Sequence, residues 1–384
     1  MSRLACGFVF VAACGFNAAG GGVSGDDGGG PSPDAVTTAD GAIDTSVTTP
    51  DAPDNCIGSG TLKVCLQALP TQPLDYSIST TLEPGTNGLT CAATTNSEAS
   101  GWCVLAGTTI NIAAGATVRV LGDKPIVFAA VGTLTVAGVI DASSRASTVG
   151  AGGDSPACPL GQAATSGNSS GGGYGGSFGG LGGLGESNDG GTGGMAPAIA
   201  TVPAGTLRGG CAGGAGGTLS SSASAPGHGG GAFALVSRTL LALDGSTLNA
   251  SGSGGRVGAL GKQGGGGGGS GGMIALDAPT ITATGATIFA NGGGGAEGNG
   301  GVVGAPGEDA TSATTMAQGG SGLSATGGDG GAGSLGGSGG TPPMNANPAG
   351  GGGGGGGGGT GVIHTSSLLT GATVSPSGPP PVDS

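Results

Sequence analysis

The stretch TINIAAGATVRV, residues 109–120, contains the pattern that predicts the fold: an alternating aliphatic run, a glycine and a second short aliphatic run. Ile110 and Ile112, then Val118 and Val120, would lie on one face, because side chains alternate in direction along a strand. A helix is disfavoured, since the runs are short, β-branched and interrupted by glycine. We therefore expect two short strands joined by a turn at Gly115.

The same pattern recurs along the chain. It is found as TLTVAGVIDAS (133–143), TLLALDGSTLNAS (239–251), TITATGATIFAN (280–291) and SLLTGATVS (367–375). Four of the five copies are preceded by a further short apolar strand candidate, at residues 126–130, 233–236, 273–276 and 362–364. Such a unit can bury its apolar face only against the next unit, so the repetition predicts a stack of coils.

The glycines that mark the five copies are unevenly spaced. Gly115, Gly138, Gly245, Gly285 and Gly371 lie 23, 107, 40 and 86 residues apart. A coil of about 20 residues with long insertions in some turns gives such spacings. We predict an all-β protein with a right-handed parallel β-helix (a β-solenoid) over residues 108–375 and Gly-rich insertions at 150–231, 252–272 and 292–361. A β-sandwich is the alternative, because short β-branched runs around a glycine also occur there.

Residues 108–144 resemble the right-handed β-helix sequences of filamentous haemagglutinins and autotransporter passengers. The alternation of such units with glycine tracts resembles Gly-rich surface lipoproteins of environmental bacteria. The resemblance covers about a third of the chain. It implies a cell-surface protein, and because many β-helices are polysaccharide lyases or hydrolases, it also raises a carbohydrate-binding or carbohydrate-cleaving role.

Glycine dominates the composition, with 99 of 384 residues. A collagen triple helix is excluded, because no Gly-X-Y register is sustained and the prolines lie mostly outside the glycine tracts. Only 8% of residues are charged and 3% aromatic, so the core must be thin and aliphatic. The tracts themselves leave two interpretations open: flexible coil, or extended helices with three residues per turn that pack closely enough to hydrogen-bond laterally.

The formal net charge is -13, and the nine Lys and Arg residues are spread singly along the chain. No basic stripe could neutralise phosphates, so nucleic acid is not an expected partner. Many of the acidic residues lie within residues 15–55, which are rich in Gly, Pro, Asp and Thr and lack apolar periodicity. This composition is typical of a disordered, solvated linker.

The N-terminus predicts export and lipidation. Arg3 precedes an apolar run over residues 4–13 that is too short to span a bilayer and is typical of a signal peptide. Val11-Ala12-Ala13-Cys14 resembles a bacterial lipobox, which implies that residues 1–13 are removed and Cys14 is lipidated. A chance cysteine in a short leader is the alternative. We expect the linker of residues 14–55 to tether the protein by its lipid to a bacterial outer membrane or cell surface.

Six cysteines follow the linker: Cys56, Cys65, Cys91, Cys103, Cys158 and Cys211. An even number suits three disulfides in an oxidising compartment. Metal binding is the weaker alternative, because no C-x-x-C pair occurs and neither His228 nor His364 lies at zinc-ligand spacing from a cysteine. The sequence leaves 15 pairings open, and the simplest has two bridges within a Cys-rich cap at residues 56–107 and one from Cys158 to Cys211. Residues 376–384 are expected to form a disordered tail.

The sequence contains no catalytic motif in the structural context that the motif requires. Gly-x-Ser-x-Gly occurs around Ser177, Ser270 and Ser338, but none follows a strand and opens a helix as a nucleophile elbow must. The carboxylates near the predicted coils belong to Asp123 beside Lys124, Asp141 with Arg145, and Asp244, and are better explained as turn caps and exposed pairs. His228 and His364 have no evident partner. We predict no catalytic residue, no metal and no cofactor.

These observations favour a non-enzymatic surface lipoprotein with a structural, adhesive or matrix-contact role. Extracellular polysaccharide or surface proteins are the expected partners, besides the membrane that holds the lipid anchor. Two alternatives stay open. One is a polysaccharide-binding or polysaccharide-cleaving β-helix, and the other is an ice- or mineral-binding repeat, which requires Thr133, Thr135, Thr280 and Thr282 to form a flat regular array.

Overall fold

The computed structural model describes residues 54–376, except 59–61, 85–88, 97, 204, 220–222, 260 and 344–349. Two compact units divide the chain, Met1–Ala52 and Pro53–Ser384, and only the second is described below. The predicted signal peptide, the lipidation residue Cys14, nearly all of the linker and the tail beyond Pro376 lie outside the described residues.

The described residues form short β-strands and one turn of 3-10 helix, Glu98–Gly101. The strands are β1 (Cys56–Ile57), β2 (Val64–Cys65), β3 (Leu74–Tyr76), β4 (Thr80–Leu82), β5 (Cys103–Gly107), β6 (Ile110–Ile112), β7 (Thr117–Val120), β8 (Ile126–Ala130), β9 (Leu134–Val136), β10 (Val139–Asp141), β11 (Ala232–Ser237), β12 (Leu240–Ala242), β13 (Thr247–Asn249), β14 (Met273–Asp277), β15 (Thr280–Thr282), β16 (Thr287–Phe289), β17 (Val362–Thr365) and β18 (Thr373–Ser375). The four additional strands predicted ahead of the repeats correspond to β8, β11, β14 and β17.

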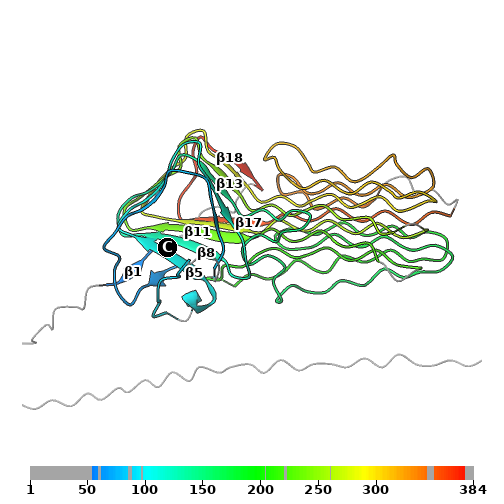
Figure 1. Cartoon of the computed structure of the whole chain (residues 1–384), viewed down its shortest axis with the longest axis horizontal. Helices are drawn as coiled ribbons and strands as arrows, with labels where there is room; N and C mark the ends of the chain where they lie inside the picture. The colour runs from blue at the N-terminus through cyan, green and yellow to red at the C-terminus, as the bar shows by residue number, and fades with distance from the viewer. Residues whose placement is uncertain are drawn as a thin grey trace, which may run out of the picture. The chain divides into compact units, whose positions relative to one another are not determined.

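Apart from the β1–β2 hairpin, these strands stack in three parallel sheets (Figure 1). Sheet 1 has the order β3-β6-β9-β12-β15, sheet 2 the order β4-β7-β10-β13-β16-β18, and sheet 3 the order β5-β8-β11-β14-β17. Successive coils contribute successive strands to each sheet, and the registers match residue for residue, as in Ile140 beside Val118 and Leu248. The all-β class with stacked parallel strands is therefore confirmed, whereas β-sandwiches are built from antiparallel sheets.

One hydrophobic core receives the inward side chains of all three sheets. In β6, Ile110 and Ile112 are buried while Asn111 between them is exposed, which is the alternation expected from the sequence. Phe128 of sheet 3 is fully buried, and its ring meets Tyr76 of sheet 1 edge to face with 6.3 Å between centroids. Apart from such contacts the core is aliphatic, as the low aromatic content predicts.

The repeated glycines occupy the turns that precede the strands of sheet 2. Gly115, Gly245, Gly285 and Gly371 have φ of +80°, +72°, +70° and +76°, a region that side chains rarely tolerate. Gly138 has no such φ, but a Cβ there would lie 2.3 Å from the carbonyl oxygen of Ala116. These turns therefore require glycine for two different reasons, positive φ and close backbone approach.

Sheet 3 is buried on both faces. Every residue of β8, β11 and β14 is buried, and the outward side chains pack in a second hydrophobic cluster. The β1–β2 hairpin contributes Ile57 and Val64 to this cluster, and the first glycine-rich insertion contributes Phe178 and Leu207. Two-sided burial explains why these strands are continuous apolar runs in the sequence.

The stack begins at Leu74, inside the segment that the sequence analysis sets apart as an N-terminal cap. Strands β3, β4 and β5 belong to the three parallel sheets. The sequence did not indicate this coil, because β3 (LDY) and β4 (TTL) are three residues long and partly polar, too short to display an alternation. At this corner β7 and β8 are joined by a compact turn of residues 121–125, whereas β4 and β5 are separated by residues 83–102.

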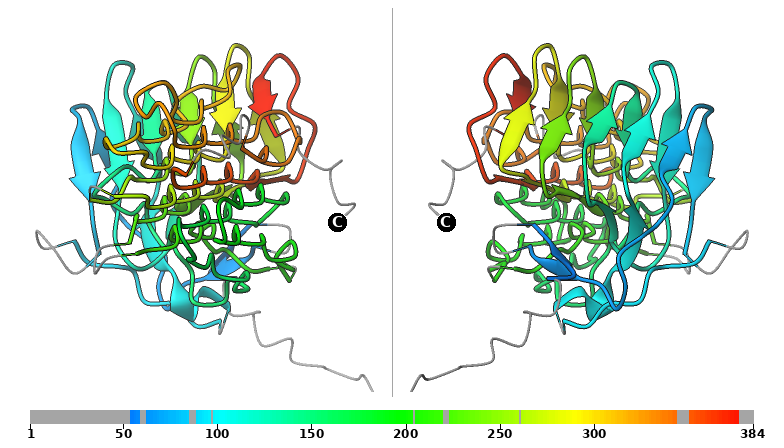
Figure 2. Two further views of the ribbon diagram at one scale, coloured as in Figure 1. Left: turned by 90° about the vertical axis from the view of Figure 1, so that its right-hand side faces the viewer. Right: turned by 90° about the vertical axis from the view of Figure 1, so that its left-hand side faces the viewer.

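The three glycine-rich insertions all leave the stack at the same corner. They follow β10, β13 and β16 of sheet 2 and return at β11, β14 and β17 of sheet 3. Figure 1 shows their chain segments running side by side away from the strands, and Figure 2 shows the same segments end on as a layered array. The insertions therefore form one structure, the glycine bundle, built of residues 142–231, 250–272 and 290–361.

Candidate functional site

Hydrogen bonds in the glycine bundle repeat every third residue. In the segment 263–272, Gly265, Gly268 and Gly271 donate their N–H groups to Gly353, Gly356 and Gly359 at 2.9 to 3.0 Å. The residues one position earlier donate to segment 207–218, and those one position later donate to segment 250–256. A three-residue period with lateral bonds and no internal ones is that of packed polyproline II helices.

The segments can pack this closely because glycine has no side chain. A Cβ on Gly267 would lie 1.8 Å from the carbonyl oxygen of Tyr174, one on Gly268 would lie 2.1 Å from that of Gly293, and one on Gly269 would lie 2.0 Å from that of His228. Three consecutive residues therefore point at three different neighbouring segments. A Cβ on any of these three residues would push a neighbour away, so glycine is a packing requirement there.

Central segments are bonded on every side. Segment 263–272 exchanges hydrogen bonds with residues 170–176, 211–217, 227–230, 250–256, 293–299 and 353–359. Segment 351–361 is enclosed in the same way and is almost wholly buried. Of the two interpretations that the sequence left open for the described tracts, the ordered one is found, because cooperative lateral bonding offsets the entropy of ordering glycine.

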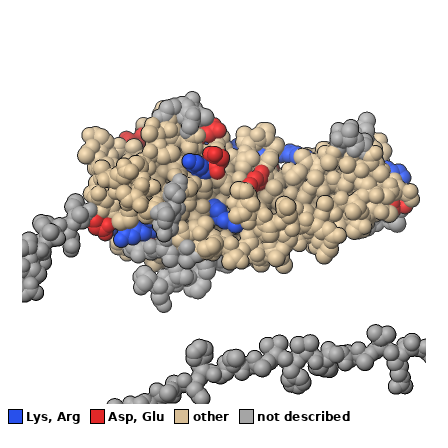
Figure 3. All heavy atoms as spheres, turned by 90° about the horizontal axis from the view of Figure 1, so that it is seen from below, with Lys and Arg blue, Asp and Glu red and all other residues tan. Residues whose placement is uncertain are grey.

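The outside of the bundle carries several exposed aliphatic side chains. Leu181, Leu184 and Met195 have 51%, 50% and 53% of their surface exposed. Their segments are neighbours, because Gly185 donates its N–H to the carbonyl of Gly194 at 2.8 Å. On the face drawn in Figure 3, charged side chains are few and scattered, and uncharged residues cover most of the bundle.

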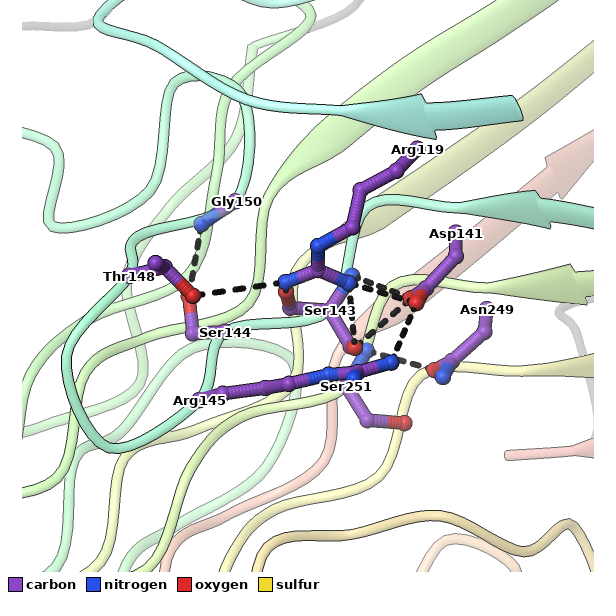
Figure 4. A network of polar contacts seen from close by, with 9 residues as sticks. All are labelled: Arg119, Asp141, Ser143, Ser144, Arg145, Thr148, Gly150, Asn249 and Ser251. Carbon is purple, nitrogen blue, oxygen red and sulfur yellow. Dashed lines mark hydrogen bonds and ion pairs between the residues drawn. The ribbon is translucent and has the colours of Figure 1, made fainter. Parts of the chain in front are cut away.

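Asp141, one of the carboxylates predicted near the coils, lies at the base of the first insertion (Figure 4). Its Oδ2 accepts hydrogen bonds from Arg119 at 2.5 Å and Arg145 at 2.7 Å, and its Oδ1 accepts from the hydroxyl of Ser143 at 2.6 Å and its N–H at 3.0 Å. The Asp141 side chain is 7% exposed and that of Arg119 16%. The predicted pair with Arg145 is present, but no sequence pattern indicated Arg119, which reaches Asp141 from the neighbouring strand β7.

The other predicted carboxylates do not join a cluster. Asp123 and Lys124 are exposed in the turn before β8. Asp244 is exposed and caps a turn, accepting from the Thr284 N–H at 2.8 Å and the Thr282 hydroxyl at 3.0 Å. These residues fit the turn-capping interpretation, and they do not approach Asp141 as the paired acids of a glycosidase would.

His228 has a partner that the sequence analysis missed. Its Nδ1 lies 2.6 Å from Oδ2 of Asp154, whose Oδ1 accepts the Gly229 N–H at 2.7 Å. The hydrogen bond to Asp154 raises the pKa of His228, aided by the charges of Asp154 and Asp309 and opposed by burial and Arg256. Because 74 residues separate the pair, no spacing could reveal it. His364, by contrast, is half-buried in β17, where burial lowers its pKa.

This pair predicts a pH-dependent stability. A group whose pKa is raised by folding stabilises the protein fully below its unfolded pKa of 6.5, and the contribution is lost as pH rises through the folded pKa. We expect the full chain to lose stability, relative to a His228→Asn variant, as pH rises from 6.5 through the raised folded pKa of His228, measured by urea unfolding. His364→Asn serves as the control, and equal pH slopes for His228→Asn and the unaltered protein would contradict the prediction.

The serines of the rejected nucleophile motifs are structural. Ser177 accepts the Gly182 N–H at 3.0 Å, Ser270 accepts the Cys211 N–H at 2.8 Å, and Ser338 donates to the Leu335 carbonyl at 2.6 Å. Among the described residues there is no group of three or more His, Cys, Asp or Glu side chains that could hold a metal. The described helical segment is also far too short to cross a membrane.

Threonines of the strands form rows along the sheets. On sheet 1, Thr135 and Thr282 share a row with Asn111 and Ala242, so the array required for ice or mineral binding is interrupted there. Sheet 2 carries a more regular row of outward residues. Its members in register are Thr117, Val139, Thr247, Thr287 and Thr373.

Three disulfides join the cysteines that follow the linker: Cys56–Cys65, Cys91–Cys103 and Cys158–Cys211. The first closes the β1–β2 hairpin, the second ties β5 to the segment before it, and the third lies at the base of the bundle. Comparisons of the chain with protein-family models, curated proteins and solved structures give no significant match. The geometry above is therefore the basis for the function.

Proposed function

We propose that this chain is a non-enzymatic, lipid-anchored protein of a bacterial outer membrane or cell surface, with a structural, adhesive or matrix-contact role. In this proposal a right-handed parallel β-solenoid supports the glycine bundle, which makes the contacts. A right-handed path is favoured because crossovers between parallel strands of one sheet are right-handed in nearly all proteins. The lipobox at Cys14 and the linker that follows it would hold the folded unit at the membrane.

The observation that carries the proposal is the common exit of all three insertions. Because each leaves sheet 2 and returns to sheet 3, insertions far apart in sequence hydrogen-bond into one bundle. Such a bundle is ordered through its backbone and presents small or aliphatic side chains outward. A rigid, weakly charged projection suits contact with a surface or matrix better than chemistry on a small molecule.

The polar groups near the coils support the same conclusion. Asp141 is saturated by two arginines and Ser143, and Asp244 is engaged by a turn. A general acid or base needs a lone pair or proton directed at a substrate, and neither carboxylate offers one in this arrangement. Neither Asp141 nor Asp244 therefore supplies the acid or base that the polysaccharide-cleaving alternative requires.

The test of this proposal is made in a two-membrane bacterial host. Cells producing the full chain are fed an alkyne-tagged fatty acid, and the label on the protein is compared between the unaltered chain and Cys14→Ser, with Cys6→Ser as the matched control. We expect label on the unaltered and Cys6→Ser chains only, and protease accessibility in intact cells. Equal labelling of Cys14→Ser, or a protein recovered unprocessed in the cytoplasm, would refute the proposal.

A further inference from the structure

A buried arginine without a carboxylate partner lies against the disulfide at the base of the bundle. Arg208 is 9% exposed, and its Nη2 lies 3.4 Å from Sγ of Cys158 and 3.6 Å from Sγ of Cys211. Its Nη1 donates to the Ala157 carbonyl at 3.4 Å, and its Cζ lies 5.1 Å from the ring centroid of Phe178.

Among the residues that the structure describes, this guanidinium has no counter-ion. The ion pairs of the described residues do not include Arg208, and its buried Nε has no hydrogen-bond partner. Burial lowers its pKa, but arginine keeps its proton in proteins. A charge so placed costs free energy unless an anion meets it, and the two sulfur atoms are the nearest groups that can become anions.

We propose that Cys158–Cys211 is a thiol–disulfide exchange site that a dithiol reductant opens selectively, with Arg208 as the counter-ion of the thiolate that is released. This inference stands on the contacts of Arg208 and does not depend on the proposed surface role. It assigns selective thiol–disulfide exchange to Cys158–Cys211 and not to the other two disulfides.

The exchange proceeds in two balanced steps. One thiolate of the dithiol attacks Sγ of the half-buried Cys158, the Cys158–Cys211 bond breaks, and Cys211 leaves as a thiolate beside Arg208. The second thiolate of the dithiol then attacks the reductant's first sulfur, which is bonded to Cys158 in the mixed disulfide. This step closes the cyclic disulfide of the reductant and releases Cys158 as a thiolate. The dithiol loses two electrons, and the protein disulfide gains them.

The backbone keeps the leaving sulfur in place. The Cys211 N–H donates to the Ser270 hydroxyl at 2.8 Å, and the Ser270 N–H donates to the Cys211 carbonyl at 3.0 Å. Cys211 is therefore held on the central segment of the bundle, while the half-buried Cys158 follows the exposed residues Pro156 and Ala157. A positive charge near a leaving thiol lowers its pKa and speeds its departure.

Cys91–Cys103 is a matched control within the same molecule. It also joins a half-buried cysteine to a fully buried one, Cys103 being 0% exposed and Cys211 1%. Of the cations nearest to it in sequence, Lys63 pairs with Asp54 and Arg119 with Asp141, and Lys124 is exposed in a turn. A difference between the two disulfides thus reports on Arg208 rather than on access.

The experiment follows each disulfide separately in the full chain. Free thiols are first blocked with N-ethylmaleimide, dithiothreitol is added, and samples are quenched with acid, alkylated and quantified by mass spectrometry. We expect Cys158–Cys211 to open faster than Cys91–Cys103, and Arg208→Met to slow its opening about three- to tenfold while Cys91–Cys103 is unchanged. Arg208→Lys, which keeps the charge, should retain most of the rate.

Two results would overturn the proposal. One is a Cys158–Cys211 opening rate that Arg208→Met leaves unaltered, or that Arg208→Lys slows as much as Arg208→Met does. The other needs no variant. In the reduced unaltered protein, the rate of iodoacetamide alkylation should reach half its maximum at lower pH for Cys211, beside Arg208, than for the equally buried Cys103. Equal midpoints would mean that Arg208 does not stabilise the thiolate.

Discussion

Replacing Gly267 by alanine is expected to disrupt the glycine bundle and to destabilise the protein by at least about 3 kcal/mol. The added Cβ would lie 1.8 Å from the Tyr174 carbonyl oxygen and 2.4 Å from its carbon. No rotamer change can relieve a contact with backbone, so segment 169–180 must separate from segment 263–272. The lost lateral bonds would then expose neighbouring amides, which hydrogen–deuterium exchange detects peptide by peptide.

Two control variants isolate this contact. Gly101→Ala adds the same atom where nothing lies within 4 Å and where φ is not positive, so it should change stability by less than about 0.5 kcal/mol. Ala215→Ser alters an exposed side chain on a neighbouring segment of the bundle and should also be neutral. Comparable exchange in the bundle of Gly267→Ala and Gly101→Ala would contradict the close packing described here.

The same variant tests the proposed role of the bundle. Cells that display the Gly267→Ala chain should lose any adhesion or matrix contact that the bundle provides, because its surface depends on order. The exchange data should show β5–β8–β11–β14–β17 still protected, since the strands bond to one another and not to the bundle centre. Adhesion that survives loss of bundle protection would move the contact surface to the strands.

The repeats were predictable because their physics is local. The alternation of buried and less buried side chains in β6 and β7, and the turn at Gly115, depend only on residues that are close together in the sequence. The coil before them was missed because β3 and β4 are three residues each and carry no readable period. Order in the glycine tracts was left open for a related reason: a glycine segment has no pattern of its own, and its partners come from other insertions.

The polar contacts show the same limit. Arg145 lies four residues from Asp141 and could be paired with it by inspection, whereas Arg119 meets it across the sheet from β7. His228 and Asp154, or Arg208 and Cys158, are brought together by the packing of the insertion. Neither of these two contacts could be predicted from the sequence, because each depends on how the insertion folds back toward the strands.

Asp141→Ala should lower the free energy of unfolding by about 3 kcal/mol, because it leaves the guanidinium of Arg119 buried without its carboxylate. The Arg119 side chain is 16% exposed, and it would keep only the Ser143 and Thr148 oxygens as acceptors. Asp123→Ala, which removes an exposed carboxylate from a turn, is the matched control and should be neutral within about 0.5 kcal/mol. Urea unfolding of the full chain measures both.

A double-mutant cycle with Arg119→Met identifies the cause. Once Arg119 no longer carries a charge, loss of Asp141 should cost less, so the double variant is expected to be more stable than the sum of the single changes predicts by about 1 to 3 kcal/mol. Additive effects would mean that the carboxylate acts through its other partners, which are the Ser143 N–H and hydroxyl and the Arg145 guanidinium. A coupled pair would identify Asp141 as the residue that fixes the corner where the first insertion leaves sheet 2, since it ends β10 and bonds the chain that follows.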